Sequence, residues 1–143
     1  MEQSKDRIRV VVDTNLWISF LLGSNFENFL EIITSPKVES IMTEKLIDEV
    51  IEVTHREKFR KYFDLTEADA LVAWLRTMTF VELRDIPIRC RDPKDDYLLE
   101  LAVMSKSIYL VSGDKDLTSL GNIEGCKIMT VKQFVTEMSS IIY

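Results

Sequence analysis

The segment IRVVV at Ile8–Val12 constrains the fold most, because isoleucine and valine dominate it. Such a composition is typical of a β-strand that is buried on both faces, as in a parallel sheet with helices on either side. The strand runs directly into Asp13, and no adjacent residue supplies a positive charge. A carboxylate at the end of a buried strand is energetically unfavourable, so we expect Asp13 to have a functional role.

Strand-like and helix-like segments alternate along the rest of the chain. We predict strands at residues 8–12, 38–42, 79–83, 108–112 and 127–130. We predict helices at residues 16–22 and 25–34, after residue 43, through a basic and aromatic segment at 55–63, from a capping box at 66–69, from residue 92, and at 131–139. The alternation predicts one three-layer α/β/α domain with a central, mostly parallel sheet of four to five strands.

The composition excludes several classes of protein. Apolar residues make up 46% and charged residues 29% of the 143 residues, as in ordinary globular proteins. We find no signal-peptide pattern and no apolar run long enough to span a bilayer, so we expect a cytoplasmic protein. Cys90 and Cys126 are expected to be reduced thiols, and His55 is the one histidine, which argues against a histidine-based metal site.

Acidic residues follow the predicted strands at the edge where parallel sheets bind ligands. Asp13 follows the first strand, and Asp114 follows the strand at 108–112. Asp95 is predicted on the buried face of its helix, and Glu49 at the border of an apolar helix face. For single acids the sequence leaves ordinary alternatives open: a solvated border charge for Glu49, and a charge that favours the helix dipole for Asp95.

The four acids together point to a bound cation. Carboxylates gathered at one sheet edge repel one another, and a divalent ion removes that penalty. Since the donors are oxygen atoms, the expected ion is Mg²⁺ or Mn²⁺, which activates a water and stabilises charge on a phosphoryl group. Asn15 and Ser112 are predicted to orient a carboxylate or a bound water. The formal net charge of −6 argues against non-specific binding to nucleic acid unless such ions reverse the local sign.

The ordered set DTN, an acid in the third helix, DPKDDYLLELA and LVSGDKDL resembles the PIN-domain ribonucleases. It is most similar to the branch found as toxins of toxin–antitoxin pairs. The resemblance extends from about Ile8 to about Met138 and implies one PIN-like domain over residues 1–143. It also implies metal-dependent cleavage of RNA phosphodiester bonds, an antitoxin protein as partner, and a homodimer.

The resemblance assigns roles to individual residues of this chain. It implies that Asp13, Glu49, Asp95 and Asp114 are catalytic, and that Asp13, Asp95, Asp114 and Asp116 are metal ligands. Glu49 would assist directly or through a water. The seven-residue spacing to Ala102 favours Asp95 over Asp96 as the helix aspartate. Ser112 stands where the family usually has threonine, and it keeps the hydroxyl.

Contacts to RNA are predicted from the basic residues. Arg89, Arg91 and Lys94 precede the acidic helix and are candidates for phosphate contacts. The segment HREKFRKYF at 55–63 offers four positive charges and aromatic rings that could bind phosphates and stack a base. The alternative for this segment is a solvated basic helix whose Phe59 and Tyr62 pack inward.

Two other functions remain open from the sequence. A phosphatase of the haloacid-dehalogenase type also has an aspartate after its first strand, but it usually has a second aspartate where this chain has Asn15. A catalytically inactive PIN-fold interaction domain would lack bound metal. A P-loop kinase is excluded, since the sequence has no GxxxxGK[ST] motif.

Overall fold

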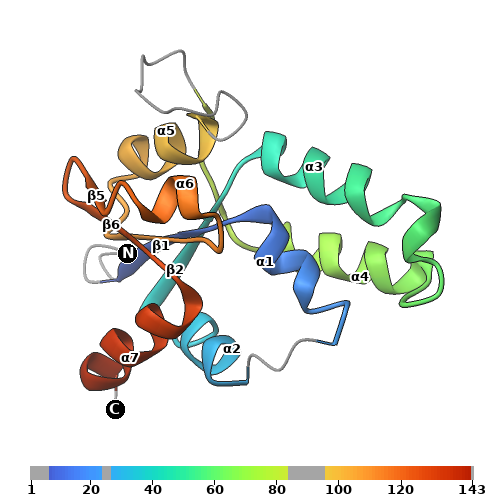
Figure 1. Cartoon of the computed structure of the whole chain (residues 1–143), viewed down its shortest axis with the longest axis horizontal. Coiled ribbons are helices and arrows are strands. Elements are labelled where there is room, and N and C mark those ends of the chain that lie inside the picture. The colour runs from blue at the N-terminus through green and yellow to red at the C-terminus, as the bar shows by residue number, and fades with distance from the viewer. Residues whose placement is uncertain (1–6, 24–26, 84–95, 143) are drawn as a thin grey trace.

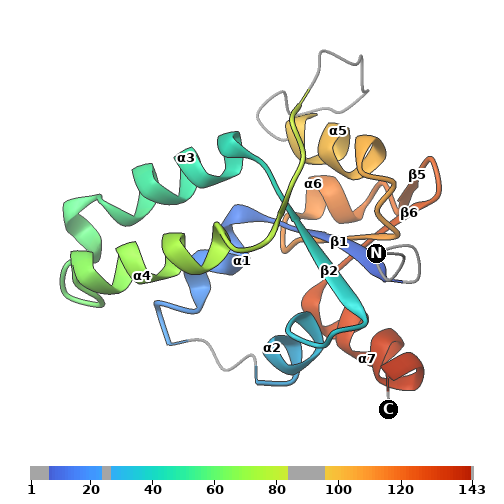
Figure 2. The same ribbon diagram turned by 180° about the vertical axis from the view of Figure 1, so that it is seen from behind.

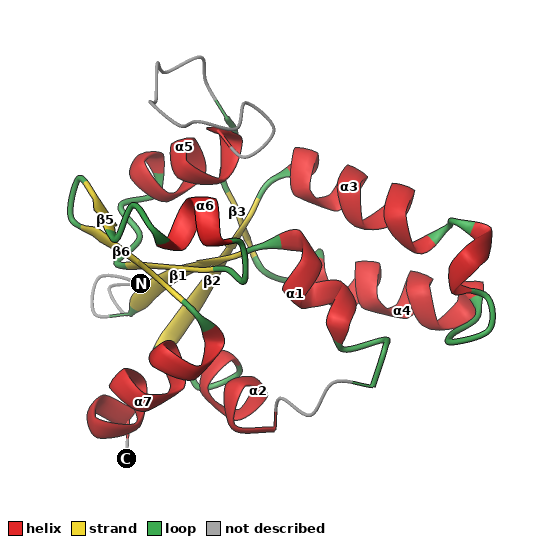
Figure 3. Cartoon of the chain, in the orientation of Figure 1, coloured by secondary structure: helices red, strands yellow, loops and turns green. Residues whose placement is uncertain are grey.

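A six-stranded sheet forms the centre of the computed structural model, which describes residues 7–23, 27–83 and 96–142. The strand order is β3-β2-β1-β4-β6-β5, and Figure 3 draws the strands in yellow. The strands are β1 (Ile8–Val12), β2 (Val38–Met42), β3 (Thr79–Phe80), β4 (Tyr109–Val111), β5 (Asn122–Ile123) and β6 (Cys126–Met129). Neighbouring strands pair in parallel except β5, which is antiparallel to β6. The predicted α/β fold is confirmed, and the sheet has six strands where four to five were predicted.

The additional strand, β5, belongs to a tight hairpin with β6. Glu124 and Gly125 connect the two strands with φ angles of 44° and 89°. Positive φ at both central residues is the geometry of the primed turns that favour two-residue hairpins. A strand of two residues is too short to show an alternating pattern, so β5 could not be predicted from periodicity.

The position of β1 in the middle of the sheet explains its apolar sequence. Its last three residues, Val10, Val11 and Val12, are fully buried. Val12 pairs with Val111 of β4, and the Asp13 amide donates to the Val111 carbonyl at 2.9 Å. This register brings the residues that follow β1 and β4 next to each other at one edge of the sheet.

Helices cover both faces of the sheet (Figures 1 and 2). The helix α5 (Asp96–Met104) packs on β1 and β4 from one side. From the other side, α2 (Glu27–Ile33) contacts β2, α7 (Val131–Ile142) contacts β4, and these two helices contact each other. The short α6 (Lys115–Thr118) lies beside β6. Among the described helices, none is long and apolar enough to cross a membrane.

Three further helices lie beyond the carboxyl ends of β1 and β2 (Figure 1). They are α1 (Thr14–Ser19), α3 (Glu44–Thr54) and α4 (Leu65–Leu75), and α3 contacts both of the others. Trp17 of α1 is fully buried, and its ring packs edge-on against Trp74 of α4 at 5.6 Å between centroids. Figure 2 shows α3 and α4 as a hairpin that points away from the sheet.

The predicted helix through residues 55–63 is wrong. Helix α3 ends at Thr54, and a single 3₁₀ turn, Glu57–Phe59, follows. The Thr54 hydroxyl donates to the Val50 carbonyl at 2.6 Å, and the Arg60 guanidinium donates to the Thr54 carbonyl. These bonds satisfy the end of the helix locally, so the chain turns instead of continuing.

Other boundaries also differ from the prediction. The capping box of α4 consists of Asp64 and Glu67, whose side chains and amides bond reciprocally at 2.8 and 3.0 Å. Helix α1 begins at Thr14, earlier than predicted, because Asp13 caps it. Strand β3 ends at Phe80, before the predicted end at residue 83. Its partner strand β2 already ends at Met42, just before α3 begins. The predicted helix start at Asp92 lies outside the described residues.

Candidate active site

The site is built around Asp13, the residue that follows β1. Its side chain caps α1 by accepting a hydrogen bond from the Asn15 amide at 3.3 Å. Its other oxygen, Oδ2, accepts a hydrogen bond from the Ser112 hydroxyl at 2.7 Å. Only 7% of Asp13 is exposed. The strand end, the helix start and the serine therefore hold one buried carboxylate in a fixed orientation.

Ser112 connects Asp13 to the residues that follow β4. Its fully buried hydroxyl, which donates to Asp13, also accepts a hydrogen bond from the Asp114 amide at 3.0 Å. The Asp114 side chain in turn caps α6, where it accepts from the Asp116 amide at 2.9 Å. One hydroxyl thus links the loops that carry two of the predicted acids.

Glu49 lies on the side of α3 that faces α1. Its Oε1 accepts hydrogen bonds from the Thr14 hydroxyl at 2.9 Å and from the Tyr97 hydroxyl. These two hydroxyls are also 3.2 Å from each other. The Lys45 ammonium lies 4.7 Å from the centroid of the Tyr97 ring. The glutamate is therefore turned toward the interior by a small polar cluster.

Thr14 and Tyr97 were not predicted as site residues. Thr14 is the middle residue of the DTN segment, and Tyr97 directly follows the acids of DPKDDYLLELA. Both residues lie within motifs that the sequence analysis singled out. Hydroxyl residues next to acids are common in proteins, however, so neither residue could be recognised as part of a site from the sequence. Their role became visible only when the fold brought α1, α3 and α5 together.

The pKa of Asp13 is affected by its burial, its hydrogen bonds and the charges of two other acids. Burial raises the pKa of Asp13, and the charges of Asp114 and Glu49 raise it further, while the hydrogen bonds from Ser112 and Asn15 lower it. Burial and the bond to Glu49 also raise the pKa of Tyr97, so its hydroxyl stays a neutral donor. The cluster is therefore short of positive charge, and a cation would relieve the repulsion.

Not all predicted site residues fall within the described part of the chain. Asp95, Arg89, Arg91 and Lys94 lie outside it, and so does the side chain of Asp96. Within the described ranges, no three acidic, histidine or cysteine side chains form a group that could hold a metal ion. Asp116 and Asn15 are exposed, and their amides rather than their side chains are seen in contact with the acids. The oxygen donors that are present suit a hard divalent cation.

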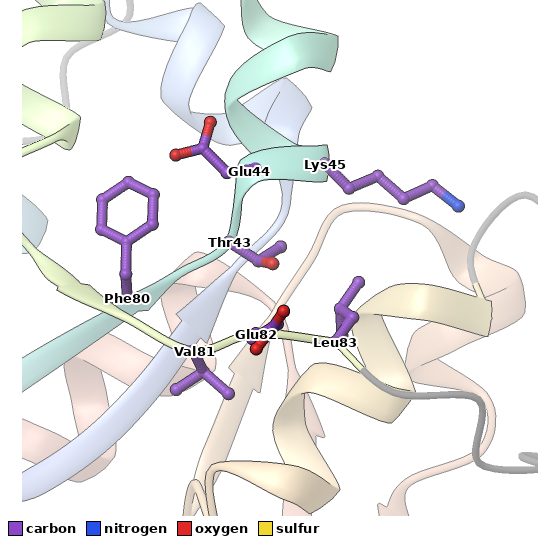
Figure 4. Close-up of a pocket in the computed structure, with 7 residues that line it drawn as sticks. All are labelled: Thr43, Glu44, Lys45, Phe80, Val81, Glu82 and Leu83. Carbon is purple, nitrogen blue, oxygen red and sulfur yellow. The ribbon is translucent and has the colours of Figure 1, made fainter.

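A pocket of about 660 Å³ lies next to this edge of the sheet (Figure 4). It is formed by the ends of β2 and β3 and the start of α3, and its lining residues are Thr43, Glu44, Lys45, Phe80, Val81, Glu82 and Leu83. The same Lys45 that contacts the Tyr97 ring is part of this lining. The pocket therefore adjoins the polar cluster around Glu49 and offers space beside it.

Comparison with known proteins identifies the family. The sequence profile described as "PIN domain" matches residues 9–116, which include Asp13, Glu49 and Asp114. The chain is 30% identical over 156 aligned positions to the uncharacterized protein MJ1680 of Methanocaldococcus jannaschii, and the match covers 99% of this chain and 98% of that protein. The PIN domain of human SMG5 has a TM-score of 0.44 at 14% identity, covering 90% of this chain and 97% of that one.

PIN domains are generally nucleases, and PIN-domain nucleases typically use divalent metal ions. The family profile spans most of the chain, and the six-stranded, mostly parallel sheet is consistent with it. The chain therefore belongs to the PIN domain family.

Proposed function

We propose that this protein is a ribonuclease that hydrolyses RNA phosphodiester bonds with the help of Mg²⁺ or Mn²⁺. The observation that carries the proposal is the buried Asp13 carboxylate, which Ser112 holds within the field of Asp114 and Glu49. Burying a carboxylate beside two other acids is unfavourable unless a cation compensates the charge. A protein gains from such an arrangement when the cation takes part in its activity.

The residues of the chain would divide the work in the following way. Asp13, Asp95 and Asp114 would hold the ion, with Glu49 and Asp116 assisting. When bound, the ion supplies water activation and stabilises the charge that builds on the phosphoryl group. Ser112 fixes the direction of the Asp13 carboxylate, and Thr14 and Tyr97 fix that of Glu49. At metal sites, residues that hydrogen-bond to the ligands commonly fix the orientation of those ligands in this way.

Calorimetric titration with Mn²⁺ tests the metal site on which this proposal depends. We expect binding by the wild type and loss of binding in the double variant Asp13→Asn with Asp114→Asn. The matched control is Asp48→Asn, which removes an exposed acid from the same helix that carries Glu49. Binding by the control but not by the double variant supports the site. If the wild type binds no Mn²⁺, the protein is a PIN-fold interaction domain without metal, the alternative left open above.

Replacing Tyr97 by phenylalanine tests the polar cluster around Glu49. The variant keeps the ring beneath Lys45 but loses the hydroxyl that donates to Glu49. We expect the cleavage rate or the Mn²⁺ affinity to fall about tenfold, as for other partners that orient metal-binding residues. Tyr109→Phe is the control, because it removes a hydroxyl that donates to Glu137 at 2.6 Å, outside the acidic site. Equal activity of the two variants would show that Tyr97 plays no positioning role.

The family match favours the nuclease over the haloacid-dehalogenase phosphatase. A covalent phosphate on Asp13 after reaction with a phosphomonoester would reverse that preference. The toxin role, the antitoxin partner and the homodimer stay predictions that rest on the resemblance of the sequence motifs. Co-expression with an antitoxin encoded beside this protein, followed by a cleavage assay, would test them.

A further inference from the structure

The tip of the α3–α4 hairpin is the most basic short segment of an acidic protein. The hairpin tip, residues 55–63, contains four arginine or lysine residues and one glutamate, whereas the whole chain has a net charge of −6. Lys58 and Lys61 are exposed, and within the described ranges neither forms a salt bridge. Arg56 is half-exposed and has only a loose pairing with Glu52 at 3.8 Å. In the described part of the chain, the ammonium groups of Lys58 and Lys61 therefore have no carboxylate partner.

Aromatic rings accompany these charges. Tyr62 is 57% exposed, and the Lys61 ammonium lies 5.3 Å from the centroid of its ring. The Lys58 ammonium lies 5.2 Å from the centroid of the Phe59 ring. An exposed ring beside an ammonium group is suited to a base that stacks while its phosphate pairs with the lysine.

The tip is also held in a defined shape. Phe59 stacks on the buried Phe63 at 5.6 Å, and the Arg60 guanidinium closes the turn on the Thr54 carbonyl. Arg60 and Phe63 therefore build the turn, while Lys58, Lys61 and Tyr62 remain available on its surface. The sequence left open that both Phe59 and Tyr62 pack inward. In the structure only Phe59 does so, whereas Tyr62 is exposed.

We propose that the hairpin tip is a second binding site for single-stranded RNA, separate from the acidic site. The inference rests on the proposed function and names a substrate-binding surface for it. Glu49 lies in the middle of α3, and the tip begins six residues further along, about 9 Å down the helix axis. Figure 1 shows the tip at the end of the hairpin far from α5. The tip and the acids therefore contact different nucleotides of one strand.

The first test measures binding without cleavage. Fluorescence anisotropy follows a labelled oligouridine of about twelve nucleotides, within the range that such sites cover, bound to full-length Asp13→Asn protein in EDTA. We expect Tyr62→Ala to weaken binding about tenfold through loss of stacking. We expect Lys58→Ala with Lys61→Ala to reduce the slope of log affinity against log salt by about 1.4, for two phosphate contacts. The control pair is Lys37→Ala with Lys132→Ala, two exposed lysines outside the tip.

The outcome decides between RNA and another partner. Weaker binding by the tip variants but not by the control pair supports the proposal. Unchanged RNA affinity in the tip variants overturns it and leaves the exposed cations and Tyr62 to a protein partner. Equal losses in the tip and control variants also overturn it, because they would reflect only overall charge.

The second test separates this inference from the proposed function. With a long RNA substrate, the tip variants should raise KM about tenfold and leave kcat unchanged. A dinucleotide substrate, whose single phosphodiester bond is held at the acidic site and leaves no further nucleotide for the tip, should show no change. If the wild type cleaves no RNA, the proposed function fails, and the anisotropy result still decides the tip. If the wild type cleaves RNA but the tip variants keep their KM, the inference alone fails.

Discussion

Replacing Asp13 by asparagine should lower the rate of RNA cleavage by about 100-fold or more. The change removes the negative charge that interacts with Asp114 and Glu49, and with it a carboxylate that we propose as a ligand for the ion. The asparagine keeps the size of the side chain and an oxygen that can accept from the Asn15 amide. Initial rates on a labelled RNA, with Asp48→Asn as the control, measure the effect. Cleavage at the wild-type rate by a preparation free of other nucleases would contradict the assignment.

The stability of the same variant shows whether its fold is intact. Burial raises the pKa of Asp13, so the folded protein binds this proton more tightly than the unfolded chain. The stability that this proton contributes is present at low pH and is lost as the pH rises through the raised pKa. In EDTA at pH 7 the variant should therefore unfold at a higher temperature than the wild type, and the difference should shrink toward pH 4. If the inactive variant shows no cooperative unfolding transition at pH 7, its inactivity reflects the loss of its fold.

Replacing Trp17 by alanine should lower the free energy of unfolding by about 3–5 kcal/mol. Trp17 is fully buried, and its ring packs against Phe20 at 5.9 Å and Trp74 at 5.6 Å. Removing it leaves a large cavity between α1 and α4 that the surrounding helices cannot close. Since small proteins unfold with only about 5–15 kcal/mol, this is a substantial part of the total. Denaturation with guanidinium at pH 7 measures the change.

The matched control for this prediction is Leu22→Ala. Leu22 follows the same helix but is 43% exposed, so its loss should change stability by less than about 0.5 kcal/mol. A loss of less than about 1 kcal/mol in Trp17→Ala would mean that α1 does not depend on this contact. That result would also weaken the view that packing of α1 fixes the orientation of Asp13.

The strands and most helices could be predicted because their sequences carry a strong periodic signal. Ile8–Val12 and Val38–Met42 match the predicted strands residue for residue. The errors arose where a local contact determines the structure. The hydrogen bond from Arg60 to the Thr54 carbonyl ends α3, and the turn at Glu124 creates β5. Neither contact leaves a pattern that extends over several residues, which periodicity requires.

The candidate site shows the same limit at the level of single side chains. Asp13 and Asp114 were predicted as neighbours because parallel strands end at one edge, and the β1–β4 register places their loops together. The sequence suggested Ser112 as an orienting group, and the structure shows it donating to Asp13. Tyr97 could not be predicted, because its contact with Glu49 joins residues 48 positions apart on two helices. Such contacts depend on the packing angle between the two helices, and this angle cannot be inferred from the pattern of a single sequence.

The hydrogen bond from Ser112 to Asp13 has a consequence for protein synthesis. It joins residues that are 99 positions apart, so the loop between them must close before the carboxylate is held in place. A growing chain exposes Asp13 early, while β4 and Ser112 leave the ribosome much later, and a domain folds as a unit once its parts are present. A nascent chain therefore cannot assemble the acidic site beside the ribosome's own RNA until most of the domain has been made.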